Sequence, residues 1–168
     1  MDNDQKTLYQ SDFYHWKKQQ KQHLQNREFD RLDLDNLIEE VDEMGRSERN
    51  TLESHLVILV LHLLKYQYQT FVINPNLYEP KEFRSWYESI SQSRMTISRL
   101  IRKNPSLKHE QDDALIDSYP DAKQAAIREM NKYLRENHQL DNTSFPDSCP
   151  WTFDDIMVDD FLPDHPQR

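Results

Sequence analysis

Apolar residues recur along this chain at the spacing of a helix, and no stretch shows the strict alternation of a half-buried strand. The pattern predicts five to six helical segments, over 12–26, 33–45, 47–71, 83–103 and 107–137, the last kinked or divided at Pro120. Residues 56–64 are apolar nearly all round the helix, which is typical of a buried central helix. The predicted fold is therefore all-α: a compact bundle with a long central helix, in a single domain over residues 1–168.

Gly45 and Pro120 each fall inside a helical pattern. Before Gly45, core positions recur at helical spacing, namely Leu34, Leu37, Ile38, Val41 and Met44. One straight helix over 34–71 would be about 55 Å long, whereas a compact domain of this length has a radius of gyration of about 15 Å. We therefore predict a break or kink at Gly45, with burial of the overhang in a dimer as the alternative. Pro120 either kinks a longer helix or begins a new one.

The two ends of the chain differ in pattern. Residues 1–8 are predicted to be a flexible N-terminus. From residue 141 onward Pro and Asp are frequent, yet large apolar residues continue to recur: Phe145, Trp151, Phe153, Ile156, Phe161 and Leu162. We therefore predict that 141–168 is a packed acidic tail with a short helix near 152–158.

The chain is acidic, with 21 Lys and Arg against 30 Asp and Glu, a net charge of −9 and a pI of about 5.2. This balance argues against nucleic acid as a partner, because neutralising phosphates requires clustered basic side chains. The charge is also uneven: residues 81–103 hold six basic and two acidic side chains, and residues 141–168 hold one basic and seven acidic ones. Because their charges are opposite, we expect these two segments to lie near each other in the fold.

Composition excludes several kinds of site. Gly45 is the only glycine, so a glycine-rich loop that cradles phosphate cannot form. Cys149 is the only cysteine, which excludes an intrachain disulfide and a two-cysteine metal motif. The N-terminus lacks a basic stretch followed by an apolar run, and the apolar run at 56–64 is far shorter than the roughly 20 residues of a membrane span. We expect a cytoplasmic protein with no membrane partner and no cofactor.

Several motifs occur in an order that resembles a known family. They include LYQSDFYHW at 8–16, NLIEEVDEMGRSER at 36–49, RSWYESISQSRMTISRLI at 84–101, and CPWT and DDFLP within 149–163. Together they resemble the bacterial family labelled domain of unknown function 29, over residues 8–163. The resemblance implies a small all-helical protein. Pro120 is a departure from the family's pattern, at a place where a continuous helix is expected of the family. It carries no established activity, cofactor or catalytic residue, so no site is transferred from it.

The histidines allow a metal site only in combination across helices. His55 and His62 are seven residues apart, or about 10.5 Å along a helix axis, which is too far for both to bind one ion. A metal-dependent, hydrolase-like bundle would therefore use His62 and His55 with a ligand from another helix, such as His15. We favour the simpler interpretation that His62 is a buried histidine hydrogen-bonded to a neighbouring helix, and we predict no metal site.

The leading functional interpretation is a binding or interaction module, and an enzyme is not favoured. Its partner would be another protein or a second copy of the chain, and the candidate contacts are four apolar residues in and beyond the predicted loop 72–82: Phe71, Ile73, Leu77 and Trp86. The acidic block over 39–43 is predicted to be a solvated helix face. An alternative interpretation is that this acidic surface makes the chain a regulator of a basic protein partner.

Overall fold

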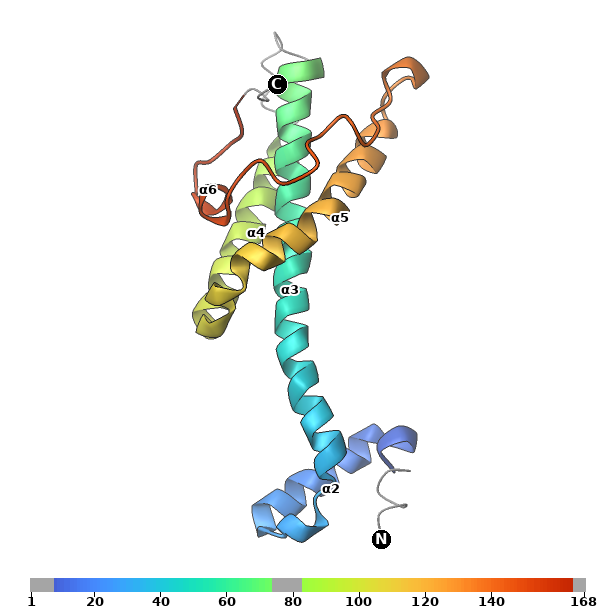
Figure 1. Ribbon diagram of the computed structural model, residues 1–168, viewed down its shortest axis with the longest axis vertical. Coiled ribbons are helices and arrows are strands. Elements are labelled where there is room, and N and C mark those ends of the chain that lie inside the picture. The colour runs from blue at the N-terminus through green and yellow to red at the C-terminus, as the bar shows by residue number, and fades with distance from the viewer. Residues whose placement is uncertain (1–7, 74–82, 165–168) are drawn as a thin grey trace. The chain divides into compact units, whose positions relative to one another are not determined.

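The computed structural model describes residues 8–73 and 83–164, and within them it contains helices and no strand, so the predicted all-α fold is confirmed (Figure 1). A helical turn at 8–11 precedes the first complete helix. The α-helices are α2 (Phe13–Asn26), α3 (Leu34–Tyr68), α4 (Arg84–Lys103), α5 (Gln111–Asn131) and α6 (Phe153–Met157). Short helical turns lie between them: η1 (Phe29–Arg31), η2 (Gln69–Ile73), η3 (Pro105–His109) and η4 (Glu136–His138).

The packing divides the chain into two compact units, and the single domain over 1–168 stays a prediction. The first unit is Met1–Ser47 and the second is Glu48–Arg168, so the division falls inside α3. Helix α3 is continuous through Gly45, so of the predicted break or kink the break is wrong. A glycine inside a helix costs only about 1 kcal/mol relative to alanine, which the flanking helix formers tolerate.

A buried polar contact holds the first unit together. Helix α2 begins where the Asp12 carboxylate accepts a hydrogen bond from the His15 amide at 3.0 Å, and it ends at Arg27, whose φ is 59°. Trp16, which is buried, donates its indole N–H to Asp33 at 3.1 Å. The buried amide oxygen of Gln20 accepts from the Asp33 backbone N–H at 2.8 Å. These bonds fix α2 against the residue that precedes α3.

The apolar face of α3 within the first unit is exposed. Leu34, Ile38, Val41 and Met44 are between 56% and 67% exposed, so the prediction that they are core positions is wrong. We call these four residues the apolar stripe. Helical spacing shows which face of a helix is apolar, but burial also requires a second surface over that face. Among the described residues, no such surface covers the stripe.

The core of the second unit surrounds the other half of α3. Leu52, Leu56, Leu59 and Leu63 are fully buried, as the central-helix prediction requires. They belong to one apolar cluster with residues of α4, α5 and the tail, and Figure 1 shows α4 and α5 lying against this half of α3. By length and composition alone, the helix Leu34–Ile73 would be able to cross a membrane, a test that the core helix of a soluble protein also passes.

Helix α5 runs without interruption through Pro120, as the family resemblance implied. Proline has no N–H to donate, so the carbonyl of Ile116, one turn earlier, loses its helical partner. Both Pro120 and Ile116 lie on the exposed side of α5, where water can satisfy that carbonyl. This position explains why the proline does not end the helix.

The acidic tail packs against the core, as predicted. Phe145, Phe153 and Ile156 are buried, and the short helix α6 begins with a reciprocal capping box between Thr152 and Asp155. The basic segment and the tail do meet, which confirms the expectation from their charges. Their contact runs through Arg94, whose guanidinium donates to three tail carbonyls, those of Ile156, Asp159 and Phe161, each at 2.7 Å.

Candidate functional site

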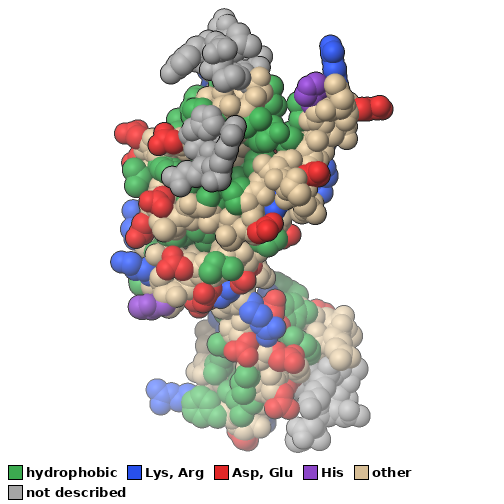
Figure 2. Space-filling view, turned by 45° about the horizontal axis from the view of Figure 1, so that its top comes forward, with side chains coloured by type: hydrophobic (Ala, Val, Ile, Leu, Met, Phe, Trp, Pro, Cys, Tyr) green, Lys and Arg blue, Asp and Glu red, His purple; other side chains and the backbone are tan. Residues whose placement is uncertain are grey.

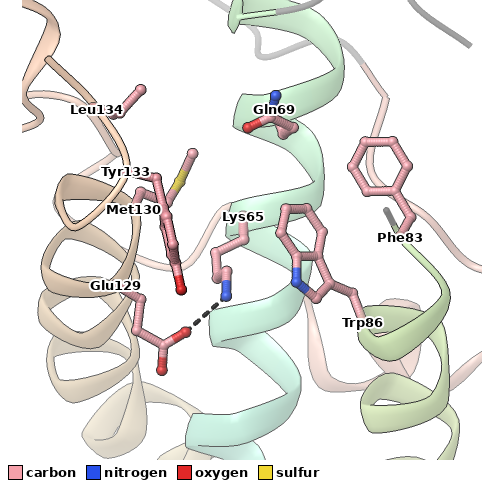
Figure 3. Close-up of a pocket in the computed structure, with 8 residues that line it drawn as sticks. All are labelled: Lys65, Gln69, Phe83, Trp86, Glu129, Met130, Tyr133 and Leu134. Atoms are coloured by element: carbon pink, nitrogen blue, oxygen red, sulfur yellow. Dashed lines mark hydrogen bonds and ion pairs between the residues drawn. The ribbon is translucent and has the colours of Figure 1, made fainter. Parts of the chain in front are cut away.

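A pocket of about 500 Å³ opens in the second unit between α3, α4 and α5 (Figure 3). Helix α3 and the turn after it supply its floor, α4 supplies an aromatic wall, and the end of α5 supplies the opposite wall. The lining side chains are Lys65, Gln69, Phe83, Trp86, Glu129, Met130, Tyr133 and Leu134. The pocket therefore combines apolar walls with a small number of polar groups, which is the composition of many ligand sites.

An ion pair forms the floor of this pocket. The Lys65 ammonium donates to the Glu129 carboxylate at 2.7 Å, and the same nitrogen lies 4.8 Å from the centre of the Trp86 ring. Burial by itself raises the pKa of Glu129, but the hydrogen bond and the charge of Lys65 outweigh it, so the net pKa is lowered. Glu129 is thus a carboxylate at neutral pH, and the Lys65 ammonium bound to it balances its charge.

His62 lies one turn before Lys65 on α3, beside this ion pair. Its Nδ1 atom is buried and has no hydrogen-bond partner among the described residues, so the prediction that His62 is hydrogen-bonded to a neighbouring helix fails for this atom. Burial lowers the pKa of His62, and the charge of Lys65 lowers it further against the opposing effect of Glu129. The imidazole is therefore neutral at pH 7.

The predicted metal ligands are not brought together in the part of the chain that the structure describes. No group of three His, Cys, Asp or Glu side chains there is arranged to hold a metal ion. His15 is exposed and belongs to the first unit, whereas His55 and His62 belong to the second. The described residues thus give no support to the hydrolase-like alternative.

The four residues predicted to contact a partner lie in different places in the structure. Trp86 lines the pocket of Figure 3. Ile73 lines a neighbouring hollow of about 710 Å³, and Phe71 lies in the same turn η2. Leu77 lies outside the described residues. Their role in binding a partner stays a prediction.

The apolar stripe of the first unit is a second candidate site, and acidic side chains surround it. Residues 34–46 contain five carboxylates and a single basic residue, Arg46. On the visible face of the first unit, acidic and apolar side chains lie next to one another (Figure 2). Glu40 accepts a hydrogen bond from the Tyr9 hydroxyl at 2.8 Å, which raises the pKa of Tyr9 to about 12. The stripe is therefore an apolar surface with an acidic border.

Sequence reasoning missed the Lys65–Glu129 pair and treated the stripe as core, with burial of an overhanging helix in a dimer as the alternative. The two partners of the pair are 64 residues apart, and spacing says nothing about such contacts. One local signal was present, since Lys65 directly follows the apolar run at 56–64 and a lysine there needs a charged partner.

Comparison with known proteins supports the resemblance described above. The family model described as "Domain of unknown function DUF29" matches residues 8–162, nearly the whole chain, so the predicted family is confirmed. Searches of curated proteins and of solved structures returned no match.

Proposed function

The chain belongs to the family Domain of unknown function DUF29. We propose that it is a protein-interaction module whose first unit binds a basic amphipathic helix of a partner protein. One observation carries the proposal. Four large apolar side chains form the stripe on α3, and each is more than half exposed. Contiguous exposed apolar side chains with a polar border are typical of protein interaction sites.

The spacing of the stripe supports a helix as the bound element. Positions 34, 38, 41 and 44 follow intervals of four, three and three residues, so they lie along one side of α3. Two helices pack by placing such rows of side chains against each other, at an interaxial distance of about 8–10 Å. An amphipathic helix with apolar residues at similar intervals matches this surface.

The charge of the border selects a basic partner over a second copy of the chain. Two copies of residues 34–46 would place five carboxylates of one beside five of the other. Like charges across an interface are unfavourable, whereas Lys and Arg around the apolar face of a partner helix would pair with these carboxylates. The interaction-module and acidic-regulator interpretations thus converge on one surface. We also propose a cytoplasmic setting, which the single thiol of Cys149 supports.

Fluorescence anisotropy with a labelled model peptide tests the proposal. The peptide carries Leu at helical spacing and Lys elsewhere, and two companions serve as controls: one with the same composition in scrambled order, and one with Glu in place of Lys. We expect saturable binding of the basic amphipathic peptide alone. Its affinity should fall at least tenfold between 0.05 M and 0.5 M salt because the charges are solvent-exposed and screened.

A matched pair of substitutions locates the binding surface. Ile38→Ser removes an apolar side chain of the stripe, and Ile116→Ser removes an equally exposed isoleucine from α5. We expect Ile38→Ser to weaken peptide binding at least fivefold and Ile116→Ser to leave it unchanged. Equal effects of the two substitutions, or equal binding of the acidic peptide, would refute the proposal. A dimer by light scattering that Ile38→Ser dissociates would identify a second copy as the occupant instead.

A further inference from the structure

We propose that the pocket between α3, α4 and α5 binds a neutral, planar heteroaromatic molecule of the purine class, held by its edge on the Lys65–Glu129 pair. This site belongs to the second unit and is independent of the stripe in the first. Its volume of about 500 Å³ is within the range of small-molecule sites.

The two walls favour a flat ligand. Figure 3 shows Trp86 and Phe83 on the α4 side, and Met130 and Tyr133 on the α5 side, with Lys65 between them. Phe83 packs edge-on against Trp86, with ring centres 5.0 Å apart, which holds the tryptophan in place. Tyr133 is 90% exposed although it lines the pocket, so its ring is available to a bound molecule. Aromatic rings and methionine sulfur both contact a planar π-system favourably.

The floor determines the charge and the polar groups of the ligand. An anionic ligand would compete with Glu129 for Lys65, and a cationic one would compete with Lys65 for Glu129, so each would disrupt the ion pair. A neutral ligand leaves the pair intact. An ammonium has three donors and a carboxylate about four acceptor positions, so both groups keep hydrogen-bonding capacity beyond their mutual bond.

A purine edge fits this spare capacity. It presents a ring or exocyclic acceptor next to an N–H donor, and the floor presents the donor Lys65 next to the acceptor Glu129. Gln69, on the turn after α3, supplies an amide that can donate and accept at the side of the same ring. Shape, neutrality and the donor–acceptor order thus point to the same class of molecule.

Ligand-observed NMR titrations with the full chain test the inference. The probes are adenosine and three planar molecules of similar shape, which are neutral benzamide, anionic benzoate and cationic benzamidinium. We expect saturable binding of adenosine, weaker binding of benzamide, and at least tenfold weaker binding of the two ions than of adenosine. No saturable binding of adenosine up to millimolar concentration, or equal binding of either ion, would overturn the proposal.

Two substitutions assign the binding to this pocket. Tyr133→Ala alters an exposed side chain, so the fold is retained, and we expect adenosine binding to weaken about fivefold. Tyr14→Ala, at an exposed tyrosine of the first unit, is the matched control and should have no effect. Glu129→Gln leaves the floor positively charged, so adenosine should bind more weakly and benzoate more tightly than in the original protein. Unchanged adenosine binding in Tyr133→Ala, or no gain of benzoate binding in Glu129→Gln, would refute the assignment.

Discussion

The two parts of helix α3 carry apolar side chains at the same helical spacing, and their surroundings are opposite. In the first unit Leu34, Ile38 and Val41 are more than half exposed, whereas in the second unit Leu52 and Leu56 are fully buried. A periodic apolar face is therefore not evidence of burial. It shows that a surface is needed over that face, and the surface can belong to the same unit or to another molecule.

The two units also differ in what stabilises them. The second unit has a large apolar cluster, and burying a leucine in such a cluster contributes about 1.5–3 kcal/mol. The first unit depends more on a polar contact, in which Asp33 binds Trp16 and Gln20. The amide nitrogen of Gln20 is buried and has no hydrogen-bond partner among the described residues, and an unpaired buried donor lowers the stability of the first unit.

The largest expected effect is a difference in the free energy of unfolding between substitutions of two leucines of the same helix. Leu56→Ala removes a fully buried side chain and should lower the free energy of unfolding by about 2–5 kcal/mol. Leu34→Ala removes a side chain of the stripe and should change it by about 0.5 kcal/mol or less. Urea unfolding followed by circular dichroism measures both values. Similar losses for the two substitutions would show that the stripe is covered in the isolated protein.

The next effect concerns the tail of the second unit. Arg94→Met removes the donor to three tail carbonyls and should lower the free energy of unfolding by about 3 kcal/mol, because one buried and two partly buried bonds are lost. Arg94 is itself buried, although it is a charged side chain. Burial lowers the pKa of Arg94, and the negative charges of Asp159 and Asp160 oppose this change.

Asp159→Asn is the control for this prediction. Arg94 binds the backbone carbonyl of Asp159, and that carbonyl remains after the substitution. We expect a loss much smaller than that of Arg94→Met, measured by the same urea unfolding. If Asp159→Asn were as damaging as Arg94→Met, the tail would be held by carboxylate charge and not by the carbonyl bonds.

The smallest expected effect is a dependence of folding stability on pH, which arises in the second unit. The pKa of His62 is lowered in the folded protein and has its ordinary value near 6.5 in the unfolded chain. Below pH 6.5 the unfolded chain therefore binds a proton more readily, and stability is lost as the pH falls. The lowered pKa of Glu129 acts in the same direction, but below its ordinary value of 4.5.

Unfolding free energies between pH 7.5 and 5.5 isolate the histidine contribution. We expect His62→Gln to flatten the decline in stability over this interval. His15→Gln, at an exposed histidine of the first unit, provides the matched substitution. An unchanged pH profile in His62→Gln would mean that the imidazole does not contribute to the decline.

The fold was more predictable than the candidate sites, for a physical reason. Helix formation and the choice of an apolar face depend on residues within about two turns of each other, so the spacing at 56–64 was enough to identify the central helix. The pocket depends on Lys65 and Glu129, which are 64 residues apart in the chain. The contact of Arg94 with the tail could not be predicted for the same reason, since its partners are backbone carbonyls of a distant segment that has no side-chain signature.

By itself, the sequence determined that this protein is helical, that most of residues 56–64 lie in a core, that the acidic tail packs, and that the chain has the motifs of its family. Only the tertiary structure decided that α3 continues through Gly45, that the stripe on its first part is exposed, and that Lys65 meets Glu129 below an aromatic wall. Local spacing fixes which side chains share a face. Burial and ion pairing require a second surface, and the chain positions that surface only when it folds.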